Sequence, residues 1–137
     1  MIKFYEGCKL KAYKDLKGII TIGYGTTGTI EGVPINPDTV ITQQQAEDAL
    51  MERLEAFTGI LSHCVKPVLS QNELDALCCL IYNVGITNFR GSKLLKAINL
   101  RDEAAIKANW LDWDHVGGQV VAGLTARRQA EYNLFIR

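Results

Sequence analysis

The 137-residue sequence lacks any apolar run long enough to span a membrane, and its first residues do not predict a signal peptide. Its 15 basic and 15 acidic residues balance, so the formal net charge of zero gives no bulk attraction to nucleic acid or to an anionic surface. Internal repeats, low-complexity tracts and linkers are also absent. The length therefore predicts one soluble domain with a core of its own.

Histidine and cysteine are scarce and lack the spacing of metal ligands. The two histidines, His63 and His115, lie far apart, and none of the four cysteines forms a C-x-x-C pair. We expect all four cysteines to be reduced thiols, with the neighbours Cys78 and Cys79 acting as small buried hydrophobes. A disulfide bridge at Cys8 is the alternative, and it would distort or shield the residues beside it.

The order of local signals predicts an α+β fold. A short helix is expected at residues 2–6, and β-branched residues alternating with Gly, Thr and Pro predict a small antiparallel sheet from 19 to about 35. Capping boxes at Thr42–Gln45 and Ser70–Glu73 open two helices, of which the second is apolar almost all round and belongs at the centre of a helical lobe. Further helices are expected at 93–98, from Asp102 towards Trp110, and at about 125–135.

Two carboxylates flanking a short connection near the start of the chain indicate acid/base chemistry. Glu6 ends the first predicted helix, whose partial negative charge favours a protonated carboxylic acid that could act as a proton donor. Asp15 lies in a polar loop between lysines and should stay ionised, and the hydroxyl of Thr21 could help it to hold a water molecule. Cleavage of a glycosidic bond needs one acid and a second carboxylate across the bond. Spacing alone, however, favours the structural interpretation, in which Glu6 is a capping or salt-bridged residue and Asp15 a turn residue.

The surrounding sequence resembles the bacteriophage lysozymes (endolysins) of glycoside hydrolase family 24. That family has a Glu, eight residues, an Asp or Cys, five residues and a Thr, and Glu6, Asp15 and Thr21 match this spacing without a gap. The resemblance covers nearly the whole chain in order. It continues through Thr42-x-x-Gln-Ala46, Asp75-Ala-Leu77, Tyr82-Asn-Val-Gly85, Phe89-x-x-Ser92-x-Leu-Leu95 and Gly123-Leu-x-x-Arg-Arg128-x-x-Glu131.

The resemblance implies hydrolysis of the β-1,4 bond between N-acetylmuramic acid and N-acetylglucosamine in peptidoglycan, for lysis of the host cell. Glu6 would be the general acid, and Asp15 with Thr21 would activate the attacking water, so the enzyme would invert the anomeric centre. Arg127 would lie near Glu6 and hold its side chain, with Arg128 as a second candidate. The residues expected to line the substrate cleft are Tyr82, Asn83 and Ser92, although Tyr82 fits a core position and Ser92 a helix cap equally well.

The same resemblance implies a lysozyme-like, two-lobed domain over residues 1–137. A small β-rich lobe at about 8–42 would be joined by a helix at about 43–62 to a larger helical lobe at about 63–137, against which residues 1–7 would pack. No cofactor, metal or nucleic acid is implied, and the protein would be a monomer. It would be made in the bacterial cytoplasm and act on the cell wall in the periplasm.

Three departures from the family bear on these expectations. Thr26 stands where many members have a histidine, and Lys93 replaces a common threonine. Only five residues precede Glu6, and some relatives carry an N-terminal signal anchor there. Either export depends on a separate membrane pore, or the sequence has been shortened at its N-terminus.

Other functions fit the sequence less well. The pattern Gly23-x-Gly25-x-x-Gly28 matches a dinucleotide-binding fingerprint, but the residues after it cannot supply the helix that such a site needs. A non-catalytic peptidoglycan-binding module would have lost a catalytic side chain, and a lytic transglycosylase would not need Asp15.

Trp110 and Trp113 are expected to pack in the helical lobe rather than to stack on sugars. A basic strip could line the cleft and attract the anionic polymer; it comprises Lys9, Lys11, Lys14 and Lys17.

Overall fold

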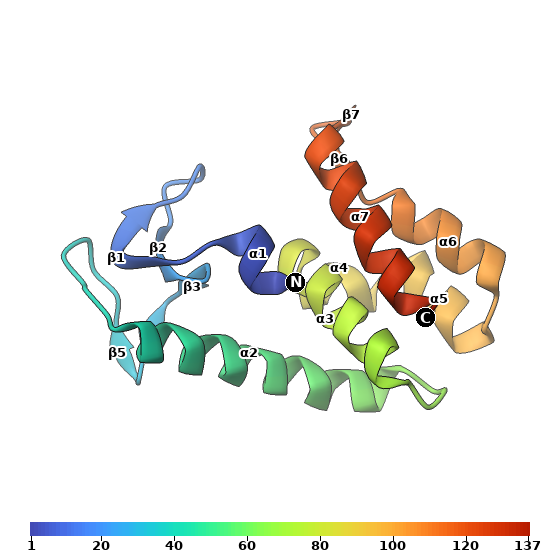
Figure 1. The fold of residues 1–137 in the computed structure, drawn as a ribbon, viewed down its shortest axis with the longest axis horizontal. Helices are drawn as coiled ribbons and strands as arrows, with labels where there is room; N and C mark the ends of the chain where they lie inside the picture. Colours follow the sequence, from blue (N-terminus) through green and yellow to red (C-terminus); the bar gives the residue numbers. More distant parts are fainter. The chain divides into compact units, whose positions relative to one another are not determined.

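The computed structural model describes all residues from 1 to 137, and it confirms the α+β class (Figure 1). The chain forms two compact units, Met1–Ala56 and Phe57–Arg137, which we call unit 1 and unit 2. The boundary between them falls within one long helix, so each unit contains a part of that helix.

Unit 1 consists of a short helix, two small sheets and residues 43–56 of the long helix. The helix α1 is Ile2–Glu6, as predicted, and it stops at Gly7, whose φ of 63° lies in the left-handed region that favours glycine. A three-stranded antiparallel sheet has the order β1-β2-β3, and a two-stranded sheet pairs β4 with β5. The strands are β1 (Lys9–Lys14), β2 (Ile20–Gly23), β3 (Thr26–Thr27), β4 (Thr29–Ile30) and β5 (Val33–Pro34).

The strand β1 was not predicted, because four of its six residues are exposed and lysines interrupt the apolar pattern. It lies at the edge of its sheet and pairs with β2 through Tyr13 opposite Thr21 and Lys14 opposite Ile20. The predicted absence of a helix after Gly28 is confirmed, since β4 and β5 follow it. A dinucleotide site of the Rossmann type is therefore ruled out at this glycine pattern.

The helix α2 (Gln43–Cys64) starts at the predicted capping box and runs two residues beyond its predicted end. The N–H of Gln45 donates to Thr42 Oγ1 (3.1 Å), and the N–H of Thr42 donates to Gln45 Oε1 (2.9 Å). These two bonds satisfy backbone donors that have no partner within the helix. The 22 residues correspond to a length of about 33 Å.

Unit 2 is almost entirely helical. Its complete helices are α3 (Gln71–Val84), α4 (Ile86–Arg90), α5 (Lys93–Leu100), α6 (Glu103–Leu111) and α7 (Ala122–Phe135). The predicted capping box Ser70–Glu73 is confirmed, and the seven consecutive residues Ala76–Tyr82 of α3 are all buried. Within this unit α3 packs most extensively against α7, and the two lie side by side in Figure 1. The apolar helix is therefore central to the helical unit, as its sequence indicated.

Two elements of unit 2 were missed by the sequence analysis. The five-residue helix α4 is too short to show an apolar periodicity. The glycine pair Gly117-Gly118 is the turn of a small hairpin between β6 (His115–Val116) and β7 (Gln119–Val120). Each strand has only two exposed residues, so no alternation could reveal it.

Candidate active site

Glu6 is the last residue of α1 in unit 1, and its side chain is half-buried. The helix is tied to α2 within the same unit by an ion pair between Lys3 Nζ and Glu47 Oε1 (3.0 Å). Lys3 Nζ also lies 5.6 Å from the centre of the Tyr24 ring. One exposed ion pair and one cation–ring contact thus join the five-residue helix that carries Glu6 to its own unit.

Asp15 is half-buried in the tight turn between β1 and β2, and its carboxylate is used asymmetrically. Oδ1 accepts hydrogen bonds from the backbone N–H groups of Lys17 (2.8 Å) and Ile19 (2.9 Å). Gly18 has a φ of 78° and donates its N–H to the carbonyl of Asp15 (2.9 Å), so glycine suits this position. The second oxygen, Oδ2, makes no hydrogen bond within the protein. The turn therefore fixes the carboxylate and leaves one oxygen available.

Thr21 lies on β2 in the same hairpin and is only 4% exposed. Its hydroxyl donates to the carbonyl of Ile19 (2.9 Å). Because the single hydroxyl hydrogen is used in this bond, Thr21 Oγ1 can interact with a further group only as an acceptor. A water molecule next to it could donate one hydrogen bond to Thr21 and another to a carboxylate oxygen.

The predicted cleft residues and Arg127 all lie in unit 2, whereas Glu6, Asp15 and Thr21 all lie in unit 1. Tyr82 is 5% exposed and packs edge-on against Phe57, with ring centres 6.3 Å apart. The next residue, Asn83, is exposed and makes no side-chain hydrogen bond within the protein. Tyr82 is therefore part of the core of unit 2, whereas the side-chain amide of Asn83 is free to bind a ligand.

Ser92 is both a helix cap and a cavity residue. Its hydroxyl accepts from the N–H of Leu95 (3.2 Å) at the start of α5 and donates to the carbonyl of Phe89 (2.6 Å). It lines a cavity of about 380 Å³ in unit 2, whose other lining residues are Asn88, Lys93, Leu94, Asn109, Asp112 and Trp113. The lining is mostly polar, with one indole ring.

The two tryptophans of this region differ in their surroundings. Trp110 is fully buried, as predicted, and its indole N–H donates to Glu131 Oε2 (3.3 Å). Trp113 was expected to pack in the same way, but it is half-buried and lines the cavity beside Ser92. The distinguishing signal is position, because Trp110 is four residues after the buried Ile106 on α6, whereas Trp113 follows the end of that helix.

Arg127 and Arg128 are both buried on α7 and share one carboxylate, that of Glu131, a motif residue to which the sequence analysis gave no role. Arg127 Nε donates to Glu131 Oε1 (3.0 Å), and its Nη2 donates to the carbonyl of Cys79 (3.1 Å). Arg128 Nη2 donates to Glu131 Oε1 (3.0 Å), and its Nε lies 2.9 Å from Oε2 without the alignment of a hydrogen bond. Burial lowers the pKa of Arg128, an effect that the charge of Glu131 opposes. A solvent-exposed face, the ordinary interpretation of two adjacent arginines, is therefore wrong here.

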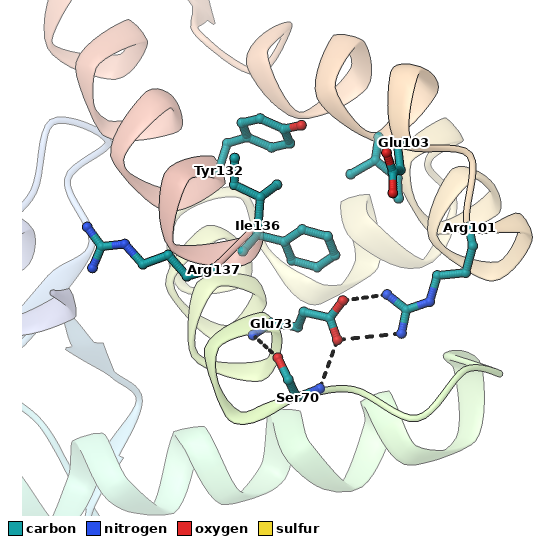
Figure 2. Close-up of a pocket in the computed structure, with 9 residues that line it drawn as sticks. Ser70, Glu73, Arg101, Glu103, Tyr132, Ile136 and Arg137 are labelled. Atoms are coloured by element: carbon teal, nitrogen blue, oxygen red, sulfur yellow. Dashed lines mark hydrogen bonds and ion pairs between the residues drawn. The ribbon is translucent and has the colours of Figure 1, made fainter.

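A second, larger cavity of unit 2 contains none of the predicted site residues (Figure 2). It measures about 480 Å³, and Ile106, Tyr132 and Phe135 form its buried apolar part. At its edge Arg101 forms an ion pair with Glu73, which also closes the capping box of α3. Arg101 and Glu73 are thus paired with each other, and the lining contains two further charged residues, Glu103 and Arg137.

Further features limit what else the chain could do. All four cysteines are free thiols, with Cys8 exposed and Cys78 and Cys79 buried. Burial raises the pKa of Cys78 to about 11 and that of Cys79 to about 12. No group of three or more His, Cys, Asp or Glu side chains is arranged to hold a metal ion. None of the helices has both the length and the apolarity needed to span a bilayer.

Comparison with known proteins identifies the family. The phage lysozyme family model matches residues 3–131. The endolysin of Acyrthosiphon pisum secondary endosymbiont phage 1 is 42% identical over 139 residues, covering 98% of this chain and 92% of the relative. The endolysin of Salmonella phage P22 is 38% identical over 135 residues, with 98% and 92% covered.

Solved structures with a similar fold point to the same family as the sequence relatives. A mutant of P22 lysozyme superimposes with a TM-score of 0.86 at 37% identity, covering 99% of this chain and 92% of that one. The muramidase domain of SpmX from Asticaccaulis excentricus also gives a TM-score of 0.86, at 28% identity and with 99% and 92% covered. These matches confirm the lysozyme-like fold and do not favour the binding-module or transglycosylase alternatives. The chain therefore belongs to the phage lysozyme family and is a lysozyme, a hydrolase that degrades peptidoglycan.

Proposed function

We propose that this lysozyme cleaves the β-1,4 bond between N-acetylmuramic acid and N-acetylglucosamine with inversion, using Glu6 as general acid and Asp15 as general base. The observation that carries the proposal is the asymmetric use of the Asp15 carboxylate. Oδ1 is fixed by two backbone N–H groups, and Oδ2 makes no bond within the protein. A general base needs both a fixed position and a free oxygen.

In the proposed reaction, a water molecule donates one hydrogen bond to Asp15 Oδ2 and a second to Thr21 Oγ1. The hydroxyl hydrogen of Thr21 already bonds to the carbonyl of Ile19, so Thr21 would orient this water as an acceptor. Attack of the water oxygen on the anomeric carbon transfers a proton to Asp15, while Glu6 protonates the departing glycosidic oxygen. An inverting enzyme holds its two carboxyl groups roughly 6.5–9.5 Å apart to leave room for this water.

Residues of unit 2 are proposed to bind the rest of the substrate. Asn83 is exposed with an uncommitted amide, which suits a hydrogen bond to a sugar or an acetamido group. Ser92 lines a polar cavity with Trp113, whose ring could pack against a sugar or a peptide. Tyr82 would support Asn83 from the core. Arg127, held by Glu131 and the carbonyl of Cys79, would position Glu6 as the family resemblance implies.

We further propose that the protein acts as a monomer in lysis of its bacterial host. It would be made in the cytoplasm and act on the cell wall in the periplasm, with a separate membrane pore as one of the two export routes considered above. Two relatives, from bacteriophages PS119 and PS34, are named SAR-endolysins.

The test is clearing of permeabilised Gram-negative cells by the parent chain and by Glu6→Gln. Loss of a general acid lowers the rate by about 10²–10⁴-fold, so the variant should clear the suspension that much more slowly. Equal clearing would show that Glu6 is not the acid. Analysis of the released sugars completes the test, because a hydrolase leaves a reducing end and a transglycosylase leaves an anhydro product.

A further inference from the structure

The turn between β1 and β2 exposes an apolar side chain to an unusual degree. Leu16, at the end of this hairpin, has a relative exposure of 108%, and Ile19 on the far side of the turn is 47% exposed. Single exposed apolar residues are common on soluble proteins and carry no meaning alone. This one differs because it lies in the turn of a hairpin that is rich in lysine. We call residues 14–19 the hairpin tip.

The hairpin concentrates positive charge in a chain whose formal net charge is zero. Residues 9–19 contain four lysines and a single carboxylate, that of Asp15. All four lysines are exposed, and none forms an ion pair; they are Lys9, Lys11, Lys14 and Lys17. The ammonium group of Lys9 lies 4.4 Å from the centre of the Tyr13 ring. Because the ring carries no net charge, this contact does not neutralise the positive charge of Lys9.

The hairpin tip is held in this shape by its own backbone. The N–H of Asp15 donates to the carbonyl of Ile19 (2.9 Å), and the N–H of Gly18 donates to the carbonyl of Asp15 (2.9 Å). The Asp15 carboxylate is turned inwards, towards the amides of Lys17 and Ile19. Leu16 and its flanking lysines therefore project from a turn whose backbone is held in place, so binding would have to order their side chains but not the turn itself.

We propose that the hairpin tip binds the surface of an anionic phospholipid bilayer. Leu16 would enter the boundary between headgroups and acyl chains, where an apolar side chain leaves water without crossing the membrane. Lys14 and Lys17 would lie at the level of the phosphates, their aliphatic stems beside Leu16 and their ammonium groups in the polar layer. Lys9 and Lys11, further along β1, would add longer-range attraction.

A polyanion without an apolar phase fits the hairpin tip less well. An anionic glycan or a nucleic acid would satisfy the lysines but would leave Leu16 in water. Only an amphiphilic surface satisfies both halves of the hairpin tip, so the apolar contribution separates a bilayer from a charged polymer.

The lysines and Leu16 are expected to contribute to membrane binding in different ways. A lysine close to an anionic membrane surface strengthens binding about fivefold, so Lys14→Gln and Lys17→Gln should each weaken it by that factor. Removing Leu16 from the boundary, as in Leu16→Ser, should weaken binding about tenfold. The lysine contribution should shrink in about 0.5 M salt, where charges are screened over a few ångströms, while the Leu16 contribution should persist.

The test is co-sedimentation of the full chain with vesicles of equimolar phosphatidylglycerol and phosphatidylcholine, and with vesicles of phosphatidylcholine alone. The variants are Leu16→Ser and the double change Lys14→Gln, Lys17→Gln. Val68→Ser and Lys107→Gln are matched controls, because Val68 is 92% exposed and Lys107 is an exposed, unpaired lysine, both in unit 2. Thermal unfolding of each variant checks that the fold is retained, which is expected because every changed side chain is exposed.

The proposal predicts binding to the anionic vesicles only, weakened by both hairpin variants and by neither control. It is overturned if the parent chain does not sediment with the anionic vesicles. It is also overturned if Leu16→Ser binds as well as the parent while the lysine variant is weakened, since the hairpin then recognises charge alone. Neither result depends on lysis of cells, so the outcome is independent of the roles proposed for Glu6 and Asp15.

Discussion

Unit 1 and unit 2 hold their important carboxylates in opposite ways. Asp15 in unit 1 is half-buried, is fixed by the backbone of its own turn, and keeps one oxygen free. Glu131 in unit 2 is fully buried, and both of its oxygens contact the side chains of Arg127, Arg128 and Trp110. A carboxylate held by local backbone can face a substrate, whereas one held by buried cations is part of the core. The two should therefore respond to the same chemical change in different measurements.

The largest effect is expected for Asp15→Asn in unit 1. Asparagine keeps an oxygen that can accept the two backbone hydrogen bonds, so the turn should persist and the melting temperature should change little. The neutral amide cannot take a proton from water, so the initial clearing rate should fall by about 10²–10⁴-fold. Asp48→Asn is the control, because Asp48 is exposed on α2 of the same unit. A variant that clears cells at the parent rate would remove Asp15 from the proposed mechanism.

For Glu131→Gln in unit 2 we expect a loss of stability, whereas Asp15→Asn should lose activity. This change leaves two buried guanidinium groups without a counter-charge, and breaking a buried ion pair in this way costs about 3–5 kcal/mol of unfolding free energy. Urea unfolding measures the loss. Glu73→Gln is the matched control, because its ion pair with Arg101 is partly exposed and such pairs contribute about 1 kcal/mol or less. Equal losses from the two variants would show that burial does not set the strength of these pairs.

A smaller effect is expected from the buried thiols at alkaline pH. The pKa of Cys78 is raised to about 11 and that of Cys79 to about 12, mainly by burial, from an ordinary value near 9. Below pH 9 the thiols are protonated in both the folded and unfolded chains, so they have no effect on the pH dependence. Above pH 9 the thiols ionise in the unfolded chain but remain protonated in the folded chain. The free energy of unfolding should therefore fall by up to about 1.4 kcal/mol per pH unit for each thiol.

Urea unfolding between pH 8 and 10 would measure this fall. The double change Cys78→Ala, Cys79→Ala should have a flatter profile, although its stability will be lower at every pH. A parent profile as flat as that of the double variant would contradict the assignment.

Local signals account for what the sequence predicted correctly. The capping boxes at Thr42 and Ser70 each depend on groups three residues apart, and both are present in the structure. The first helix and its stop at Gly7 are likewise set by neighbours in the chain. The residues of the proposed acid and base lie within one such stretch, which is why the sequence could place Glu6 and Asp15 on a helix end and in a turn.

Features that depend on distant residues were not predictable in the same way. Glu131 is important because of what it contacts, and its contact with Trp110 spans 21 residues. The difference between Trp110 and Trp113 likewise depends on which side of a helix end each one falls. The lysines between residues 9 and 17 were visible in the sequence, but the full exposure of Leu16 among them became apparent only in the structure.

The buried run Ala76–Tyr82 of α3 has a consequence for the motions of the helical unit. With no side solvated over two turns of helix, these residues have no route by which their amides can meet water one at a time. Their hydrogen exchange should therefore require unit 2 to open as a whole, whereas the ends of α3 can fray separately. Deuterium uptake at this segment would thus measure the cooperative stability of the helical unit in the native protein, without a denaturant.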